Sequence, residues 1–390
     1  MAMGKPVVLK GFKAGLPRFG RPQHESFQWL ASAHARSAAT ASGLEHSLSK
    51  WQERMTQIVH RYSCAPEFIG WRRSDIPDFM HTDWPQMLIF NLHENPRGRG
   101  LETRSAFYAE TASRMVESLF LCDADPPSDL LHVSCTGYVS PSAIQRLIEQ
   151  KGWNGRTQAT HVYHMGCYAS LPALRIAAGL LTRCGGDIRP RAEVVHTELC
   201  TLHFNPADHS PGQLVIQTLF GDGHIRYSVT PADHAGVTRD EDAFEVLALR
   251  EEIVPGSLKD MTWVLSEWGF QMTLSREVPG KIAASLPRFL STLFRAAGMK
   301  FENDAGGAIF AVHPGGPRIL DSVEEILGLG KRQLRLSRTV LFEGGNMSSA
   351  TLPHIWKAAA SDPEIKPGAL IASLAFGPGL TIAGALFRKC

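Results

Sequence analysis

The chain has 390 residues, of which 44% are hydrophobic and 20% are charged, and its formal net charge at pH 7 is +2. These values are typical of a globular protein with one large core or two fused cores, and the near-neutral charge argues against nucleic acid as a partner. Seven cysteines without a CxxC pair indicate neither a disulfide framework nor a structural zinc site.

The N-terminal stretch carries lysines but lacks the apolar segment of a signal peptide. No run of residues approaches the ~18 apolar positions that a membrane-spanning helix needs. We therefore expect a cytoplasmic protein with no membrane span, in which individual thiols stay reduced and available for chemistry.

In chain order, roughly the first 120 residues look mostly helical by their periodicity. Residues 129–135 then predict a buried strand, 136–141 a loop, and 142–153 a helix that begins at a serine cap. The unit recurs, with further strands and amphipathic helices predicted at 160–167, 169–183 and 191–199. This alternation favours layers of helices on sheets.

A stretch rich in Pro and Asp, residues 230–243, is the best candidate for a boundary between domains. It divides the chain into an N-terminal half, 1–235, and a C-terminal half, 236–390. Helices and strands alternate in the second half as well, with a helix at 279–298, a strand at 308–316 and a helix at 317–330.

Cys167 lies where an apolar strand-like stretch ends and an amphipathic helix begins. A thiol at a helix N-terminus feels the positive end of the helix dipole, which favours the thiolate. Gly166 before it allows the sharp turn that a nucleophile at such an elbow requires. The alternative is a buried structural cysteine, a common fate of free thiols.

His313 ends an apolar strand and opens the turn PGGP, a position from which its ring can reach a cleft as base or charge partner. Among 16 histidines, however, a purely structural role is the commoner outcome. Asn346 follows two glycines just before a helix, where a helix cap is the simplest role. Together, Cys167, His313 and Asn346 could supply nucleophile, acid–base group and oxyanion donor.

Five short motifs in this order resemble the type III polyketide synthases, the chalcone synthase-like group of the thiolase fold. They are Gly166–Ala169, Leu219–Gly223, His313–Pro317, Gly345–Ala350 and Phe376–Leu380. The likeness extends from about residue 20 to 385. It implies an α/β fold with thiolase-like αβαβα layers, built from two similar halves.

The resemblance also implies a mechanism. Cys167 would take an acyl group from an acyl-CoA starter as a thiolate paired with an imidazolium on His313. His313 and Asn346 would then stabilise the enolate formed when malonyl-CoA loses CO2, and the enolate would extend the chain. Repeated extension and cyclisation would give a resorcinol or a pyrone. No metal or redox cofactor is implied, and the enzyme would be a homodimer.

The resemblance assigns further residues to the substrate pocket. Phe220 matches the family's aromatic gatekeeper, although an ordinary core Phe would look the same. Met272 stands where the plant enzymes have a second gatekeeper Phe, and Trp263 where they have a glycine. Because Cys135, Cys200 and His203 replace usual threonines, a fatty acyl starter is favoured over an aromatic one. The remaining pocket positions are Thr136, Ser348 and Ser140, the last beside the partner's cavity.

Candidates for holding CoA are the basic residues Arg61, Arg72, Arg73 and Arg318. The main alternative function is a ketosynthase of the fatty-acid initiation type, which performs a single condensation onto acyl carrier protein with the same three residue types. A catalytically inactive binding protein on the thiolase fold is a second alternative. A papain-like hydrolase also uses Cys, His and Asn, but the sequence around Cys167 does not match that family.

Overall fold

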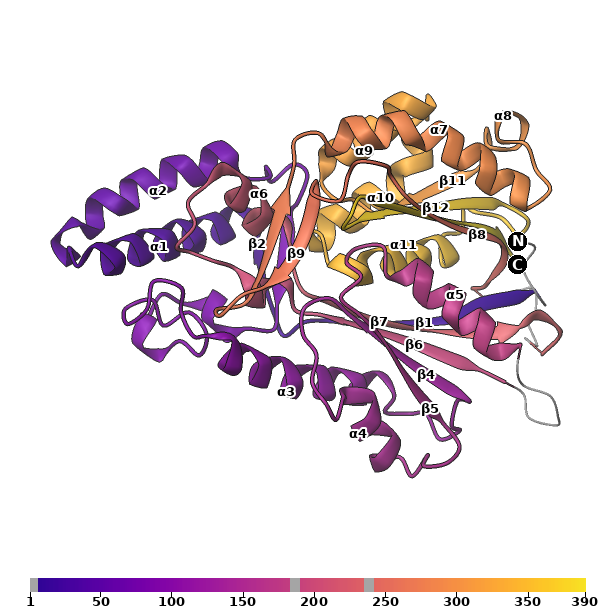
Figure 1. Ribbon diagram of the computed structural model, residues 1–390, viewed down its shortest axis with the longest axis horizontal. Coiled ribbons are helices and arrows are strands. Elements are labelled where there is room, and N and C mark those ends of the chain that lie inside the picture. Colours follow the sequence, from indigo (N-terminus) through magenta and orange to yellow (C-terminus); the bar gives the residue numbers. More distant parts are fainter. Residues whose placement is uncertain (1–5, 183–189, 235–241) are drawn as a thin grey trace.

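At the centre of the computed structural model lies a mixed sheet of nine strands (Figure 1). Residues 6–182, 190–234 and 242–390 are described. The strands of this sheet are β1 (Val7–Gly15), β4 (Asp129–Ser134), β5 (Gln158–Tyr163), β6 (Ala192–Glu198), β7 (Gly223–Pro231), β8 (Phe244–Ile253), β11 (Ile309–Val312), β12 (Leu370–Gly377) and β13 (Thr381–Lys389). Their order across the sheet is β11-β12-β13-β8-β1-β7-β6-β4-β5.

Helices cover the sheet and extend beyond it at one end. They are α1 (Gln23–Ser42), α2 (Leu48–Tyr62), α3 (Leu101–Leu119), α4 (Ala143–Gln150), α5 (Ser170–Leu181), α6 (Pro211–Leu219), α7 (Val278–Ala296), α8 (Phe301–Asp304), α9 (Pro317–Leu327), α10 (Lys331–Gly344) and α11 (Thr351–Ala360). Two small sheets add β2 (Phe19–Pro22) with β3 (Trp71–Ser74), and β9 (Met261–Leu265) with β10 (Phe270–Leu274).

The strand pairing of the central sheet repeats one pattern. In the first half, β4 runs parallel to β5 and β6, and β6, β7 and β1 then pair antiparallel in turn. In the second half, β11 runs parallel to β12, and β12, β13 and β8 pair antiparallel in turn. The antiparallel contact between β1 and β8 joins the two halves into one continuous sheet.

The layers alternate between helices and strands, as Figure 1 shows. Helices α5 and α11 lie between the two halves of the sheet: α5 contacts β6 and also β13, and α11 contacts β7 and also β11. Helices α3 and α4 cover the outside of one half, and α7 covers the outside of the other. All seven residues of β6 are buried, as expected of a strand with both faces covered. The predicted αβαβα layering is confirmed.

Several locally encoded elements are where the sequence predicts them. The strand at 129–135 is β4, and the following helix is α4. The Ser142 side chain caps α4 by accepting a hydrogen bond from the Gln145 backbone N–H, and the Gln145 side-chain oxygen accepts one from the Ser142 backbone N–H. This reciprocal cap satisfies two N–H groups that the helix itself leaves unpaired.

The prediction that the first 120 residues are mostly helical is wrong for a large part of them. Residues 63–100 hold only β3 and short 3-10 turns, and β1 is an inner strand of the main sheet. The register of β1 shifts between Lys10 and Lys13, around Gly11 with φ of 66°. This irregularity breaks the alternation of side chains that would have marked a strand in the sequence.

The predicted boundary at 230–243 falls where the chain leaves β7 at Pro231 and enters β8 at Phe244. Residues 235–241 of that stretch lie outside the described residues. Because the sheet is continuous from β1 to β8, the division into domains 1–235 and 236–390 stays a prediction. Among the described helices, none combines the length and the apolar character needed to cross a bilayer.

Candidate active site

The ends of three parallel strands bring the first candidate residues together. Cys135 follows β4, Cys167 follows β5 by a short turn, and Cys200 follows β6. Parallel strands present their carboxyl ends at one edge of a sheet, which is where ligands bind in many α/β proteins. The three thiols therefore line one cavity instead of being dispersed.

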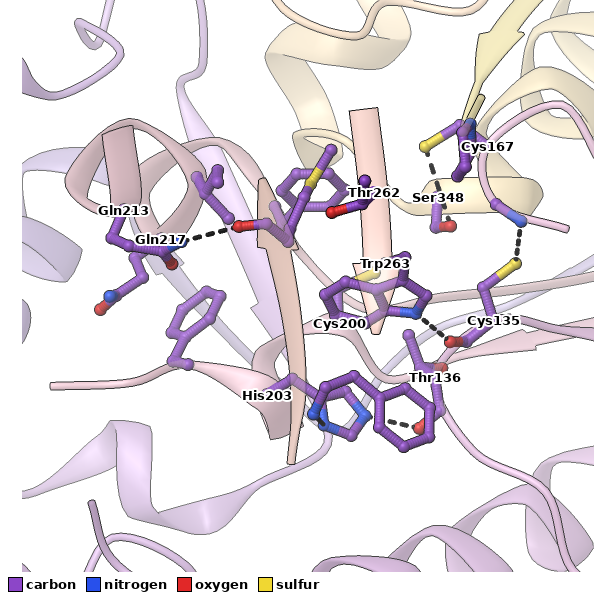
Figure 2. A pocket seen from close by; sticks show the side chains of 17 residues that line it. Cys135, Thr136, Cys167, Cys200, His203, Gln213, Gln217, Thr262, Trp263 and Ser348 are labelled. Atoms are coloured by element: carbon purple, nitrogen blue, oxygen red, sulfur yellow. Dashed lines mark hydrogen bonds between the residues drawn. The ribbon is translucent and has the colours of Figure 1, made fainter. Parts of the chain in front are cut away.

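This cavity contains about 630 Å³ of space between atoms, part of it open to solvent. Figure 2 shows Cys167, Ser348 and Cys135 at one end of it and Gln213 and Gln217 at the other, with Trp263 between. The residues around it are Cys135, Thr136, Gly166, Cys167, Cys200, His203, Phe204, Gln213, Ile216, Gln217, Phe220, Thr262, Trp263, Phe270, Met272, Ser348 and Pro378. Its wall is largely apolar and aromatic.

Cys167 sits at the elbow that the sequence predicts. Gly166 has φ of 81°, and a Cβ atom at this position would lie 2.3 Å from Cδ of Pro378. Only glycine fits both the backbone conformation and the space. The turn after Gly166 leads into α5, so Cys167 lies just ahead of the helix N-terminus and is 8% exposed.

Asn346 reaches the same point from the C-terminal half. The Ser348 backbone N–H donates to Asn346 Oδ1 at 2.9 Å, and Cys167 Sγ lies 3.9 Å from Ser348 Oγ. With its oxygen engaged, the Asn346 carboxamide has its NH2 group available, and this side chain lowers the pKa of Cys167, which favours the thiolate. Ser348 holds φ of 49°, a strained backbone angle of the kind found at functional sites.

His313 lies at the same edge of the sheet. Its backbone N–H donates to Leu374 O at 2.8 Å, at the carboxyl end of β11 beside β12. The continuation of β12 contacts the elbow, because Pro378 packs against Gly166. The His313 ring is fully buried, and neither ring nitrogen has a hydrogen-bond partner among the described residues. An imidazole in this condition can accept or donate a proton once a substrate group arrives.

The resting charge state differs from the expected thiolate–imidazolium pair. Burial raises the pKa of Cys167 to about 12, with Glu198 adding to the effect and the Ser348 and Asn346 hydrogen bonds opposing it. Burial lowers the pKa of His313 to about 3. Both groups are therefore neutral near pH 7 in this structure. The helix dipole stabilises the Cys167 thiolate, but burial destabilises it by a larger amount, so the pKa rises.

Glu198 is a site residue that sequence reasoning missed. Its carboxylate accepts hydrogen bonds from the Cys135 backbone N–H at 3.0 Å and from Thr136 Oγ1 at 2.8 Å, and Ser349 Oγ also donates to it. Burial raises its pKa in spite of these bonds. The signal in the sequence was a glutamate at the end of the apolar strand 191–199, where a charged side chain is costly without partners.

Of the predicted pocket residues, Phe220, Met272, Trp263, Cys135, Thr136, Cys200, His203 and Ser348 all line the cavity. Ser140 does not; it is exposed on the loop before α4. Sequence reasoning missed a set of lining residues on α6, namely Gln213, Ile216 and Gln217. These recur with Phe220 at helical spacing, a pattern that was readable as one helix face.

The hairpin β9–β10 forms one wall of the cavity. Trp263 Nε1 donates to Cys135 O at 2.6 Å, and its ring meets that of His203 edge to face. The His203 ring stacks on the Phe270 ring with ring centres 4.3 Å apart, and His203 Nδ1 accepts a hydrogen bond from the Phe270 backbone N–H. These contacts fix the indole of Trp263 inside the cavity between its two ends (Figure 2).

The four candidate CoA-binding arginines occupy different surroundings. Arg72 is buried, and its guanidinium donates to Gln23 Oε1 and to the backbone oxygens of Gln217 and Phe220. Two of its three guanidinium nitrogens are thus engaged within the protein, which indicates a structural role, and its assignment as a CoA ligand stays a prediction. Arg61 and Arg318 are exposed, and Arg73 is half-buried. Among the described residues, no group of side chains is arranged to hold a metal ion.

Comparison with known proteins agrees with this geometry. The model of the chalcone and stilbene synthase N-terminal domain matches residues 124–230, and that of the C-terminal domain matches residues 245–390. A "probable polyketide synthase 1" of Dictyostelium discoideum is 30% identical over 262 residues, which make up 67% of this chain. The match spans only 8% of the length of that protein.

Solved structures share the fold over nearly the whole chain. The C-terminal type III polyketide synthase domain of Steely1, a type I/III hybrid from Dictyostelium, is 23% identical with a TM-score of 0.79, covering 98% of this chain and 99% of that one. A polyketide synthase from the brown alga Ectocarpus siliculosus is 22% identical with a TM-score of 0.82, covering 99% of each chain. The 1,3,6,8-tetrahydroxynaphthalene synthase of Streptomyces coelicolor is 23% identical with a TM-score of 0.77, covering 98% of this chain and 99% of that one.

The fold likeness confirms the thiolase-like architecture predicted from the sequence. The two domain models identify the family, since together they match both halves of the chain and include Cys167, His313 and Asn346. The chain belongs to the chalcone and stilbene synthase family, and is thus a type III polyketide synthase.

Proposed function

We propose that this chain transfers a fatty acyl group from CoA to Cys167, extends it repeatedly with malonyl-CoA, and cyclises the product to a resorcinol or a pyrone. The observation that carries the proposal is the position of the Cys167 thiol, which opens beside Asn346 into a long, mainly apolar cavity. A family of condensing enzymes that work on CoA thioesters is the natural setting for such a thiol.

In the loading step, the Cys167 sulfur attacks the carbonyl carbon of the acyl thioester and its proton passes to His313. CoA leaves as a thiol after taking that proton back. The neutral state of both groups in the structure fits this sequence, because a neutral imidazole can accept the proton.

In the extension step, malonyl-CoA loses CO2 and the electron pair of the broken bond becomes an enolate. The Asn346 NH2 group and a ring N–H of His313 would hold the enolate oxygen. One well-placed donor of this kind is worth about 3–4 kcal/mol. The enolate carbon attacks the acyl carbonyl carbon on Cys167 and expels the Cys167 thiolate, which leaves a chain two carbons longer on CoA. The thiolate takes up a proton from solvent to restore the free thiol.

The lining supports an aliphatic starter. Cys200 and Met272 give the wall soft, pliable side chains, and Phe204, Phe220 and Phe270 add apolar rings. The Trp263 indole projects into the space between the two ends of the cavity and would bend or shorten the path of the growing chain. No metal or redox cofactor takes part in these steps; acyl-CoA and malonyl-CoA are substrates. We also propose a homodimer, with exposed Ser140 facing the partner's cavity.

The proposal is tested by incubating the protein with acyl-CoA starters of two to eighteen carbons and malonyl-CoA, and measuring product masses. We expect triketides and tetraketides from long-chain starters. A single condensation that requires acyl carrier protein would instead favour the ketosynthase alternative.

Loading is tested separately by intact-protein mass after exposure to acyl-CoA alone. We expect the wild type to gain one acyl group and Cys167→Ala to gain none, since the nucleophile is gone. Cys200→Ala is the matched control, because it removes another thiol of the same cavity and leaves the elbow intact. Acyl transfer to the Cys167→Ala protein at the wild-type rate would refute the assigned nucleophile.

A further inference from the structure

We propose that Gln217 is a substrate-binding residue whose side-chain N–H donates to a carbonyl oxygen of the thioester substrate. The proposal deepens the function above and rests on it. Gln217 belongs to the face of α6 that lines the cavity, and Figure 2 shows it with Gln213 at the end away from Cys167. Its side chain is 1% exposed, so its hydrogen bonds are made within the protein or with a bound molecule.

The orientation of the Gln217 carboxamide follows from its neighbours. Its Nε2 lies 3.0 Å from the backbone oxygen of Asn205, which can only accept a hydrogen bond. The NH2 group must therefore face Asn205. Its Oε1 consequently faces His34 Nε2, 3.0 Å away, and the histidine must be the donor.

A second histidine supports this arrangement. His34 is fully buried, and burial, followed by the nearby His209, lowers its pKa to about 3, so the ring is neutral. Because Nε2 carries its only proton, Nδ1 must accept, and His209 Nδ1 lies 2.9 Å from it. Hydrogen bonds thus run in one direction, from His209 through His34 to Gln217 Oε1.

One donor of Gln217 remains. The amide has two N–H groups, of which Asn205 takes one, and the second has no partner among the described residues. A buried N–H without an acceptor is unfavourable, so a ligand carbonyl at this position would be bound by a donor that is already oriented. The neighbouring Gln213 has a different partner, because its Nε2 donates a hydrogen bond to the backbone oxygen of Met272 at 2.8 Å.

Gln23 shows what a saturated buried carboxamide looks like in the same region. Its Nε2 donates to Cys64 O at 3.0 Å and to Thr218 O at 2.7 Å, and its Oε1 accepts from Arg72 Nε at 2.7 Å. It has no free hydrogen and does not line the cavity. The unused donor of Gln217 therefore does not follow from burial of a glutamine alone.

A carbonyl oxygen could reach Gln217 from two parts of the substrate. The pantetheine arm of a CoA thioester carries amide carbonyls, and it would lie on the side of the cavity away from Cys167 when the acyl carbon is at the sulfur. The growing chain carries a ketone on alternate carbons and acquires these only after extension. A simple fatty acyl chain offers no acceptor beyond its thioester.

The test compares the rate of Cys167 acylation by hexanoyl-CoA and by the ethyl thioester of hexanoic acid, which has no amide. If Gln217 binds the pantetheine arm, Gln217→Leu slows acylation by hexanoyl-CoA about tenfold and leaves the ethyl thioester rate unchanged, as expected for one lost hydrogen bond. Gln217→Glu keeps the size and the oxygen that His34 binds, and in its protonated form the carboxyl O–H can still donate to Asn205 O. This form lacks only the second N–H and should give the same pattern. Gln23→Leu is the control and should change both rates by one common factor.

If the growing chain is the source, both acylation rates stay at the wild-type value and the variants release products with fewer extensions than the wild type. Either pattern supports the proposal. An equal reduction of both rates with unchanged products, as for Gln23→Leu, would overturn it and assign Gln217 a structural role. Failure of the proposed function is distinguishable, because wild-type Cys167 would then gain no acyl mass from hexanoyl-CoA.

Discussion

At the reacting centre, the Cys167 sulfur and the His313 ring are both buried and both neutral in the structure. Burial disfavours the charged form of each group, so Cys167 rests as a thiol and His313 as a neutral imidazole, whose ring nitrogens have no hydrogen-bond partner among the described residues. Proton transfer between them would create two opposite charges that stabilise each other. In the proposed mechanism, His313 is the base on which the nucleophilicity of Cys167 depends.

We expect His313→Gln to slow alkylation of Cys167 by iodoacetamide at least about tenfold at pH 7. A pKa of Cys167 raised by burial means that thiolate is scarce at this pH unless a base accepts the proton. Because the thiolate fraction grows with pH without help from a base, the difference from the wild type should shrink as the pH rises toward the pKa of Cys167. Alkylation is measured by peptide mass. Equal rates in the two proteins at pH 7 would argue against the pairing.

Among the structural elements, the elbow before α5 depends on the absence of a side chain at position 166. Gly166→Ala places a methyl group against Pro378 in a backbone region that alanine avoids. We expect a loss of about 2 kcal/mol or more in unfolding free energy, together with reduced acylation of the displaced Cys167. Urea denaturation measures the first effect and intact mass the second.

Gly179 provides the control within the same helix. It lies inside α5 and a Cβ atom there would meet nothing within 4 Å. Gly179→Ala should therefore stabilise the protein by about 0.5–1 kcal/mol, because alanine is the better helix former. If the two substitutions had the same effect, the steric argument for Gly166 would fail.

The hairpin β9–β10 places the indole of Trp263 inside the cavity, between its two ends. Trp263→Gly removes that ring and its hydrogen bond to Cys135 O. We expect longer products or a changed ratio of resorcinol to pyrone, because the growing chain gains room to fold differently. Trp263→Phe retains most of the volume and should keep the wild-type product masses. The same products from all three proteins would show that this ring does not shape the chain.

At the scale of the whole molecule, many buried histidines are held neutral. Burial lowers the pKa to about 3 for His34, His132, His196, His203 and His313. A lowered folded-state pKa stabilises the protein above the unfolded value near 6.5, and this contribution is lost as the pH falls toward 3. Burial raises the pKa values of the carboxyls of Glu193, Glu198 and Asp222. These groups favour the folded protein as the pH falls, but they are fewer than the histidines.

We therefore expect the unfolding free energy to be lower at pH 5 than at pH 7. Each neutral histidine contributes at most about 1.4 kcal/mol per pH unit in this range. Urea denaturation across this interval measures the slope, and His132→Gln should reduce it because one such group is removed. A free energy that is constant or increases on acidification would contradict this account.

Local sequence signals determined several features of this protein on their own. The Ser142 cap, the strands β4 and β6, the glycine elbow and the motifs that carry Cys167, His313 and Asn346 are all encoded by neighbouring residues. Steric and capping preferences act within a few residues, so they can be recognised without the fold. The family follows from the same motifs.

Other features were decided only by the tertiary structure. The central place of β1, the burial of Arg72, the neutral state of Cys167 and His313, and the network around Glu198 and Gln217 all depend on segments far apart in the chain. A pKa or a hydrogen-bond partner depends on which groups surround a side chain and on how much water they displace. Packing between distant segments determines both the surrounding groups and the displaced water, and this packing cannot be predicted from local periodicity.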